Sequence, residues 1–440
     1  MPSPIIGTRA FVRQLLHPRK NNVAVVPARP PRVVARMLDL CNRLLSERGE
    51  ASGERLGAEA VSAFLGMSAD TRVLFFDNLA SAFSPDASSI DRAVDAYRAD
   101  YSQAHLADLQ AAVESPRQEL FRRINRALGG TAVLIEMRRH VLDALTEHPS
   151  WAAIDQDLLH LFRSWFNRGF LSLRRLDWRT SAMVLERLIE FEAVHQIQGW
   201  HDLHRRLEAD RRCYAFFHPA LPDVPLIFIE VALTRGISGN VQPLLDPNAR
   251  VEDPTRANCA TFYSITNCLE GLRGVSFGSL LIKQVAEELA KEFRRLKIFV
   301  TLSPIPGFRE WLQAVPDRIP EILRPSFTEL RGGTFDPLTA PAQVKTQLIG
   351  LCARYLLHAK RGHAPADPVA RFHLSNGARL ERLNWAGDTS SRGLERSLGL
   401  TANYLYQLDS IEENHEQYVK TYRIVATRTI ERLASGSSPL

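Results

Sequence analysis

One stretch, residues 259–308, constrains the fold more than any other because strand, loop and helix patterns follow one another within it. CATFYSIT (259–266) is a short apolar run rich in β-branched and aromatic residues, which is typical of a buried strand. SLLIKQVAEELAKEF (279–293) places Leu281, Val285 and Leu289 on one face at helical spacing. LKIFVTL (296–302) is again strand-like. The stretch therefore predicts one strand–loop–helix–strand unit.

The loop of this unit, GVSFGS (274–279), has the composition of an anion-binding loop. Its glycines let backbone N–H groups approach a ligand, and the helix N-terminus behind it favours negative charge. An arginine precedes the loop and adds a fixed positive charge. We therefore expect a phosphorylated ligand. The residues predicted to contact it are Arg273, Gly274, Val275, Ser276, Phe277, Gly278 and Ser279.

Residues 274–278 also match G-x-S-x-G, the nucleophile elbow of α/β-hydrolases. An elbow serine lies directly at the end of a strand, whereas residues 267–273 intervene here, so this interpretation is disfavoured. Residues 273–281 instead resemble the Arg-Gly-x-Gly-x-Gly-Ser-x-Leu acyl-CoA loop of the GNAT acyltransferase fold, with Ser276 in place of the middle glycine. A tight turn that binds no ligand stays open as a third interpretation.

The composition is that of a soluble globular protein with room for two domains: 440 residues, 45% hydrophobic, formal net charge +6. The mild positive charge suits an anionic substrate and gives no argument for a nucleic-acid partner. No stretch approaches the roughly 18 uninterrupted apolar residues of a membrane span, so no membrane partner is expected. Five scattered cysteines without a CxxC pair disfavour a zinc site and a disulfide framework.

The N-terminal segment is rich in basic residues: seven of them precede the first acidic residue, Asp39. We expect a frayed basic leader on a cytoplasmic protein, with a mitochondrial transit peptide as the alternative.

Helical periodicity dominates residues 32–170, and the pattern changes near Gly169. Strands are predicted at 213–217 and 226–233, a helix at 343–360, short strands or strand-flanking loops at 372–374 and 379–385, and helix again from about Leu394. The predicted fold class is α+β. An N-terminal all-helical bundle domain (1–169, with 1–31 a flexible basic leader) precedes a mixed α/β domain (170–440).

Single residues give weaker signals. Ser303 follows the second strand in TLSPIPGF, and the proline after it favours an extended backbone at the carboxyl end of a strand, where ligands bind in open sheets. His373 in ARFHLSNGA has His218 and His363 as alternative candidates, and a histidine among apolar residues is more often a core residue than a catalyst.

A cluster of four arginines could bind a phosphate, although most such clusters are solvated faces. Its members are Arg205, Arg206, Arg211 and Arg212.

Five segments together resemble the malonyl-CoA decarboxylase family over roughly residues 166–406. They are HPALPDVPLIFIEVALTRGISGNVQ, FYSITNCLEGLRGVSFGSLLIKQVAEEL, TLSPIPGFREWL, GHAPADPVARFHLSNGARLERLNWAGD and GLTANYLY. The resemblance implies a catalytic pair at Ser303 and His373 and a CoA-binding loop at Arg273–Ser279. Some family members carry glutamate where this chain has Ser276.

The same resemblance implies an N-terminal helical domain that contributes to oligomerisation, followed by a GNAT-like catalytic domain. It implies a homo-oligomer, either dimer or tetramer, that uses no metal and no organic cofactor. The expected reaction converts malonyl-CoA to acetyl-CoA and CO2 through a thioester enolate that the serine and histidine protonate. For the histidine, a pKa near 6.5 permits proton donation at neutral pH. A GNAT-type acyltransferase and a non-catalytic CoA-binding regulator are the alternatives.

Overall fold

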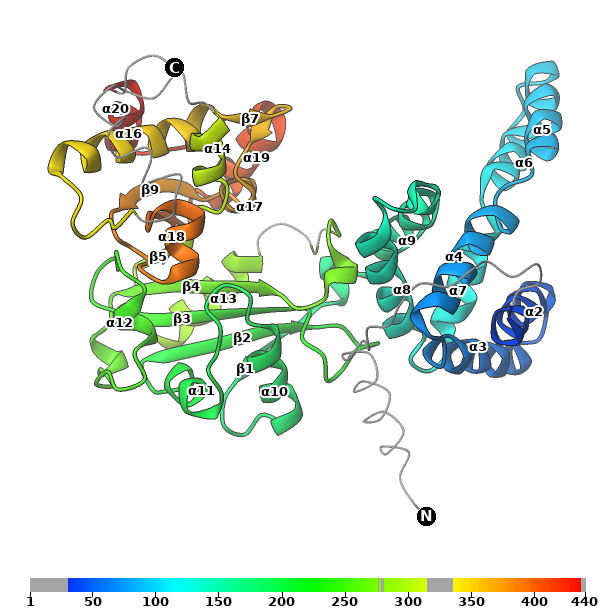
Figure 1. Cartoon of the computed structure of the whole chain (residues 1–440), viewed down its shortest axis with the longest axis horizontal. Helices are drawn as coiled ribbons and strands as arrows, with labels where there is room; N and C mark the ends of the chain where they lie inside the picture. Colours follow the sequence, from blue (N-terminus) through cyan, green and yellow to red (C-terminus); the bar gives the residue numbers. More distant parts are fainter. Residues whose placement is uncertain (1–30, 276, 278–280, 315–334, 437–440) are drawn as a thin grey trace. The chain divides into compact units, whose positions relative to one another are not determined.

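The computed structural model describes residues 31–275, 277, 281–314 and 335–436. The chain divides into two compact units, and each is described by itself (Figure 1). The helical unit comprises residues 1–170, 218–222 and 269–277, and the sheet unit comprises residues 171–217, 223–268 and 278–440. The helical unit thus includes two short segments from the middle of the chain. The predicted leader lies almost wholly outside the described residues.

The helical unit is built from antiparallel helices with short connections. They are α2 (Arg32–Ser46), α3 (Glu50–Leu65), α4 (Ala69–Ala82), α5 (Ala87–Ala99), α6 (Gln103–Val113), α7 (Pro116–Arg126), α8 (Gly130–Ala144) and α9 (Ala152–Trp165). Side chains at three N-termini accept hydrogen bonds from first-turn N–H groups: Ser68, Asp86 and Ser102. Proline occupies the first turn of α7, where it costs no hydrogen bond. Local sequence therefore sets where these helices begin.

Aromatic side chains fill the centre of the helical unit. Phe64 meets Phe75 and Phe76 edge-on at 6.2 and 6.0 Å, and Phe76 lies 5.0 Å from Trp151. All four are at most 1% exposed. The Trp151 Nε1 donates to the carboxylate of Asp77 at 2.9 Å, so its polar atom is satisfied. The prediction of an all-helical N-terminal region is confirmed.

The sheet unit contains an eight-stranded sheet in the order β1-β2-β3-β4-β5-β10-β6, with β9 also paired to β10. Its strands are β1 (Ser172–Leu176), β2 (Arg211–Phe217), β3 (Ile227–Thr234), β4 (Cys259–Asn267), β5 (Ile298–Thr301), β6 (Ser303–Pro304), β9 (Arg379–Asn384) and β10 (Thr401–Leu405). A separate hairpin joins β7 (Lys360–Arg361) to β8 (Ala364–Pro365). The mixed α/β fold class of this part of the chain is confirmed.

The parallel pair β4–β5 breaks an otherwise antiparallel sheet. The helix α13 (Leu281–Glu292) lies between these strands in sequence, as a parallel connection requires. Their register runs from Cys259↔Ile298 to Phe262↔Thr301 and then stops, although β4 continues against β3 to Asn267. At this point Tyr263 is the extra residue of a β-bulge in β4. After β5 the chain pairs with β10 through β6 and no longer with β4. Ser303 therefore lies where the β4 and β5 strands separate.

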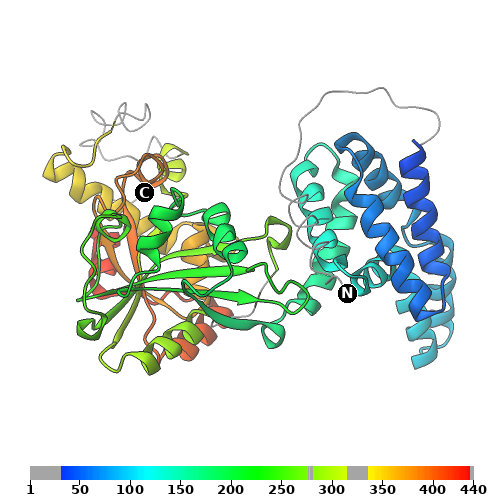
Figure 2. The same cartoon turned by 90° about the horizontal axis from the view of Figure 1, so that it is seen from below.

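Helices cover both faces of the sheet, with α10 and α11 over one face and α13 over the other (Figure 2). The remaining helices are α10 (Ala182–Phe191), α11 (Trp200–Arg206), α12 (Gln242–Leu245), α14 (Phe308–Ala314), α16 (Ala342–His358), α17 (Pro368–Ser375), α18 (Ser391–Ser397), α19 (Ile411–Thr421) and α20 (Arg428–Gly436). In the described part of the chain, no helix has the length and apolarity needed to cross a membrane.

Most predicted elements are present, with two errors. The strands at 213–217, 226–233 and 259–266 and the helix at 343–360 match β2, β3, β4 and α16. The short strand predicted at 372–374 is wrong, because these residues lie in α17. The continuous helix expected after Leu394 is also wrong, because β10 interrupts it. β10 was missed because TANYL is only five residues long and follows a helical run.

Candidate active site

Ser303 and His373 meet inside the sheet unit. Ser303 lies in β6 and His373 lies near the end of α17. The Ser303 Oγ and the His373 Nε2 are 2.9 Å apart. Ser303 is 5% exposed and His373 is 3% exposed, so bulk water does not compete for this contact. The fold thus brings together two polar side chains that the sequence separates by 70 positions.

The backbone of the β5–β6 segment orients the serine. Ser303 pairs with Ala402 of β10 and has the extended conformation that its following proline favours. Side chains alternate along a strand, so Thr301 and Ser303 point to the same face. The Ser303 hydroxyl donates to the Thr301 Oγ1 at 2.8 Å, and the Tyr404 N–H donates to the same Thr301 oxygen at 3.2 Å. The serine hydroxyl therefore has a defined resting direction.

His373 is positioned by a helix instead of the predicted strand or loop. Asp367 caps the N-terminus of α17, and Pro368 occupies its first turn. Gly377, with φ of +81°, follows the end of the helix in a left-handed conformation that other residues rarely adopt. The sequence contains both signals of this helix: Asp367-Pro368 at its beginning and Gly377 after its end. The apolar triplet FHL led to the prediction of a strand instead.

Tyr406 is a third member of this group, and sequence reasoning missed it. Its hydroxyl lies 2.9 Å from the His373 Nδ1, and it is 1% exposed. Because the Ser303 hydroxyl donates to Thr301, Ser303 accepts from the His373 Nε2–H. The His373 Nδ1 then accepts from the Tyr406 O–H. The hydrogen bonds thus run in one direction from Tyr406 to Thr301 and select the Nε2-protonated tautomer of the imidazole.

Burial controls the charge of these groups. Desolvation lowers the pKa of His373 to about 3, so its imidazole is neutral at neutral pH. The expectation of a pKa near 6.5 is therefore wrong for this buried side chain, because no carboxylate among the described residues offsets its loss of hydration. Desolvation also raises the pKa of Tyr406 well above its usual value. The site consequently holds neutral donors, and an imidazolium is not its resting state.

Asp367 links the serine segment to the histidine helix. Its Oδ1 accepts from the N–H groups of Val369 and Ala370 in the first turn of α17, both at 2.9 Å. Its Oδ2 accepts from the Gly307 N–H at 3.3 Å and from the Tyr355 hydroxyl at 3.4 Å. The side chain is fully buried, and desolvation raises the pKa of its carboxyl group. One carboxylate thus ties the SPIPGF segment to the helix that carries His373.

The predicted acyl-CoA loop is described in part. Ser276, Gly278 and Ser279 lie outside the described residues. Leu272–Val275 forms a turn in which the Val275 N–H donates to the Leu272 carbonyl at 3.0 Å. The φ and ψ of Arg273 are −56° and 128°, and the φ of Gly274 is +80°, as in a type II turn. Open space surrounds Gly274, so the turn conformation, and not close packing, requires glycine here.

The rival histidines have structural partners elsewhere. The His218 Nε2 is 3.1 Å from the Trp165 carbonyl oxygen, and the His218 Nδ1 accepts a hydrogen bond from the Ala220 N–H at 3.2 Å. His363 is exposed and stacks on Tyr422 at 5.6 Å between ring centroids. Neither histidine has a serine hydroxyl beside it among the described contacts. Geometry therefore separates His373 from both rivals.

The basic cluster at residues 205–212 is neither a solvated face nor a free phosphate site. All four guanidinium groups are buried. Their carboxylate partners are Asp210 for Arg205 and Arg211, Asp202 and Glu230 for Arg206, and Glu292 for Arg212. Both sequence interpretations of this cluster are wrong, because the acidic partners of Arg206 and Arg212 include residues distant in the sequence. The cluster belongs to the core of the sheet unit.

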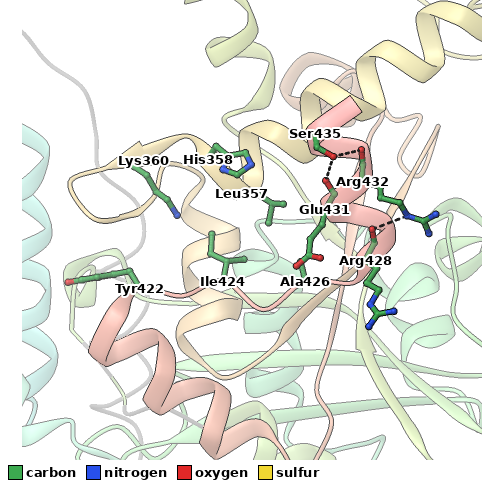
Figure 3. A pocket seen from close by; sticks show the side chains of 10 residues that line it. All are labelled: Leu357, His358, Lys360, Tyr422, Ile424, Ala426, Arg428, Glu431, Arg432 and Ser435. Atoms are coloured by element: carbon green, nitrogen blue, oxygen red, sulfur yellow. Dashed lines mark hydrogen bonds between the residues drawn. The ribbon is translucent and has the colours of Figure 1, made fainter. Parts of the chain in front are cut away.

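A cavity of about 980 Å³ lies beside α20 (Figure 3). Leu357, Lys360, Ile424 and Glu431 are among its lining residues, and neither Ser303 nor His373 lines it. The size of this cavity alone therefore does not make it the reaction site.

No group of three or more His, Cys, Asp or Glu side chains suited to a metal ion occurs within the described ranges.

Comparison with known proteins gives a consistent result over most of the chain. Residues 169–439 match the family model described as "Malonyl-CoA decarboxylase C-terminal domain". Residues 83–166 match the family model described as "Malonyl-CoA decarboxylase N-terminal domain". The mitochondrial malonyl-CoA decarboxylase of Anser anser anser is 34% identical over 427 residues, which cover 87% of this chain and 84% of that protein.

Solved structures extend this similarity to three dimensions. The malonyl-CoA decarboxylase of Rhodopseudomonas palustris is 45% identical, with a TM-score of 0.86 over 91% of this chain and 100% of that chain. The enzyme of Agrobacterium vitis is also 45% identical, with a TM-score of 0.85 over 91% of this chain and 99% of that chain. Both the helical region and the sheet region therefore have close structural counterparts.

Proposed function

The chain belongs to the malonyl-CoA decarboxylase family, and from that membership we propose that Ser303 and His373 convert malonyl-CoA to acetyl-CoA and CO2. The observation that carries this assignment is the buried series of hydrogen bonds that joins Tyr406, His373 and Ser303. The reaction needs a donor that stabilises an oxyanion and a proton source, both in a site with little water. This series supplies both functions from neutral groups.

Decarboxylation breaks the bond between the carboxyl carbon and the α-carbon of the malonyl group. The electron pair moves into the thioester, and the thioester oxygen takes on the negative charge of an enolate. A fixed O–H donor aimed at that oxygen stabilises the transition state. Ser303 can supply it, because rotation about the Cβ–Oγ bond redirects the proton that it otherwise donates to Thr301. No covalent malonyl-serine is needed, since the reaction transfers no acyl group.

The enolate then takes one proton at its α-carbon. We assign His373 as the donor, through its Nε2–H directly or through the Ser303 hydroxyl. A thioester enolate is a strong base, so a neutral imidazole N–H is acidic enough to protonate it. The Tyr406 hydroxyl at Nδ1 stabilises the imidazole as its Nε2 proton leaves. One proton from solvent restores the site after each turnover.

The loop Arg273–Ser279 is proposed to hold the phosphates of CoA. Arg273 is exposed and carries a positive charge, and the described part of the loop forms a tight turn with glycine in its left-handed position. Ser276 stands where some family members carry glutamate, so this chain lacks any contribution of that carboxylate. The binding role of the loop does not depend on it.

Incubation of the purified protein with malonyl-CoA and a chelator tests the reaction. We expect acetyl-CoA and CO2 in equal amounts. For His373→Asn, kcat should fall by roughly 10²–10⁴-fold. Ser303→Ala should lower kcat by roughly 10²–10³-fold if the hydroxyl acts as an oxyanion donor. The double variant should lose much less than the product of both factors, because the two residues act together.

Ser375→Ala and His363→Asn are matched controls, because both residues are accessible and neither contacts the pair. Their kcat should stay within about twofold of the wild type. Full activity of Ser303→Ala would contradict the assignment of the site. Acetyl transfer to an added amine without loss of CO2 would instead favour the acyltransferase alternative, and binding of CoA without turnover would favour a regulator.

We also propose a homo-oligomer, either a dimer or a tetramer, and a cytoplasmic location with the mitochondrial matrix as the alternative. The absence of metal, organic cofactor, nucleic acid and membrane partners likewise stays a prediction. Light scattering coupled to size-exclusion chromatography measures the oligomer. A monomer at micromolar concentration would contradict the first of these proposals.

A further inference from the structure

We propose that Arg138, on α8 of the helical unit, is a positioning residue for the start of the acyl-CoA loop and thereby controls affinity for the phosphates of CoA. The proposal rests on the proposed function, since it names a residue outside the loop on which substrate binding depends. It concerns the helical unit alone, because residues 269–277 belong to that unit.

Arg138 contacts two segments of the helical unit besides its own helix. Its Nη1 donates to the carbonyl oxygens of Gly271 and Arg273, both at 2.8 Å. Its Nε donates to the Asp155 Oδ1 on α9, also at 2.8 Å. Arg138 is 2% exposed. One buried guanidinium therefore holds two backbone carbonyls on either side of Leu272, and its planar fork makes this geometry specific.

Close packing holds the same segment against α8 and against Phe166, the residue that follows α9. A Cβ on Gly271 would lie 2.0 Å from the Ile135 carbonyl oxygen on α8, so only glycine fits there. Phe277 is 7% exposed, and its ring meets Phe166 edge-on at 6.5 Å. The segment is thus fixed at both ends of its described part by the helical unit.

These anchors bracket the turn at Leu272–Val275. The Arg273 carbonyl that Arg138 holds belongs to the peptide group whose N–H comes from Gly274. Fixing this carbonyl fixes the direction of that N–H, which has no hydrogen-bond partner among the described residues. The Arg273 side chain, by contrast, is exposed and available to a ligand. Loss of Arg138 should therefore loosen the turn without removing any group that touches the substrate.

The local charge also suits an anion. Burial lowers the pKa of Arg138, and the nearby charges of Arg273 and Arg163 lower it further, against the opposing effect of Asp155. Arg273 and Arg163 thus each lie close enough to Arg138 to repel its positive charge. A phosphate next to the turn would relieve this repulsion.

The test compares Arg138→Lys with Arg123→Lys in the full-length protein. Lysine keeps the charge but cannot bridge two carbonyls as the guanidinium fork does. Arg123 is a matched control, because its Nη1 donates to the carbonyls of Leu44 and Glu47 at 2.6 and 2.7 Å, and its Nε donates to Glu119 at 2.7 Å. It makes the same kind of contact at a different place in the helical unit.

For Arg138→Lys we expect KM for malonyl-CoA to rise about tenfold, with kcat within about twofold of the wild type. The dissociation constant of free CoA, measured by calorimetry, should rise by a similar factor. KM for malonyl-pantetheine, which lacks the pyrophosphate and the nucleotide, should not change. Arg123→Lys should leave all three quantities as they are in the wild type.

Unchanged CoA affinity in a folded Arg138→Lys protein would overturn the proposal. A similar loss with Arg123→Lys, or an equal rise in KM for malonyl-pantetheine, would also overturn it, because both would indicate a general effect on structure. If Arg138→Lys does not fold, Asp155→Asn provides a milder change, since it weakens the contact that orients Arg138. A wild type that binds CoA without decarboxylation would refute the proposed function, while calorimetry would still test Arg138.

Discussion

The neutral state of buried His373 makes a measurable contribution to the pH dependence of stability. The pKa of this residue is about 3 in the folded protein and about 6.5 in an unfolded chain. Below pH 6.5 the unfolded state gains a proton that the folded state does not accept. Stability is therefore lost as the pH falls from 6.5 towards 3. At pH 5 the expected loss is about 2 kcal/mol relative to pH 8.

His373→Asn removes this titration and isolates its effect. The free energy of unfolding is measured by urea denaturation at pH 8 and pH 5 for the wild type and the variant. Other titrating groups contribute equally to both proteins, so they cancel in the difference between the two pH dependences. We expect the variant to lose about 2 kcal/mol less than the wild type over this interval. Its stability at pH 8 can lie above or below that of the wild type, because asparagine makes different hydrogen bonds.

The refuting result is equally clear. If the wild type and His373→Asn lose the same stability between pH 8 and pH 5, His373 is not held neutral by burial. A larger loss in the variant would mean that a carboxylate or another group stabilises an imidazolium in the folded protein. Either result would remove the basis for a neutral proton donor in the proposed mechanism.

Three further substitutions, the last with a matched control, test residues that support the site or its predicted CoA loop. Tyr406→Phe removes the donor to the Nδ1 of His373, so kcat should fall roughly tenfold or more with little change in KM; unchanged kcat would show that the tautomer does not need this hydroxyl. Asp367→Asn should lower the free energy of unfolding by about 1–3 kcal/mol, because an amide cannot accept all four hydrogen bonds, and urea denaturation checks this. Gly274→Ala should cost about 1–2 kcal/mol at its φ of +80°, whereas Gly53→Ala in α3, where open space surrounds the glycine, should raise stability by up to about 1 kcal/mol; similar thermal shifts for both variants would contradict a left-handed turn at Gly274.

The sequence by itself determined the local elements and the order in which they occur. Apolar residues at alternating or helical spacing identified β4, α13 and β5 without any tertiary information. The extended conformation of Ser303 followed from the proline after it, which restricts its backbone directly. These features depend on residues within a few positions of one another, so a local pattern is sufficient to predict them.

The resemblance to a family selected Ser303 and His373, which local chemistry alone did not separate from many similar residues. His373 was misplaced in a strand because the triplet FHL is short and apolar, while the helix start that decides the matter lies at Asp367 and Pro368. Tyr406 lies in GLTANYLY, one of the segments that carry the resemblance, but nothing in the sequence singled it out as a site residue. A tyrosine near the end of a strand becomes part of the site only because β10 passes beside α17.

Only the tertiary structure decided which charges exist in the site and which cations are free. Burial lowers the pKa of His373, and no carboxylate in the described part of the chain opposes this effect, so the imidazole is neutral; spacing in the sequence does not report hydration. The sequence pattern around Arg206 and Arg212 is typical of surface residues. In the fold they pair with Glu230 and Glu292, which lie 24 and 80 positions away. Arg138 gave no sign of its contact with Gly271, since 133 residues separate them. Long-range pairing and burial depend on the whole chain, so a local sequence pattern does not contain them.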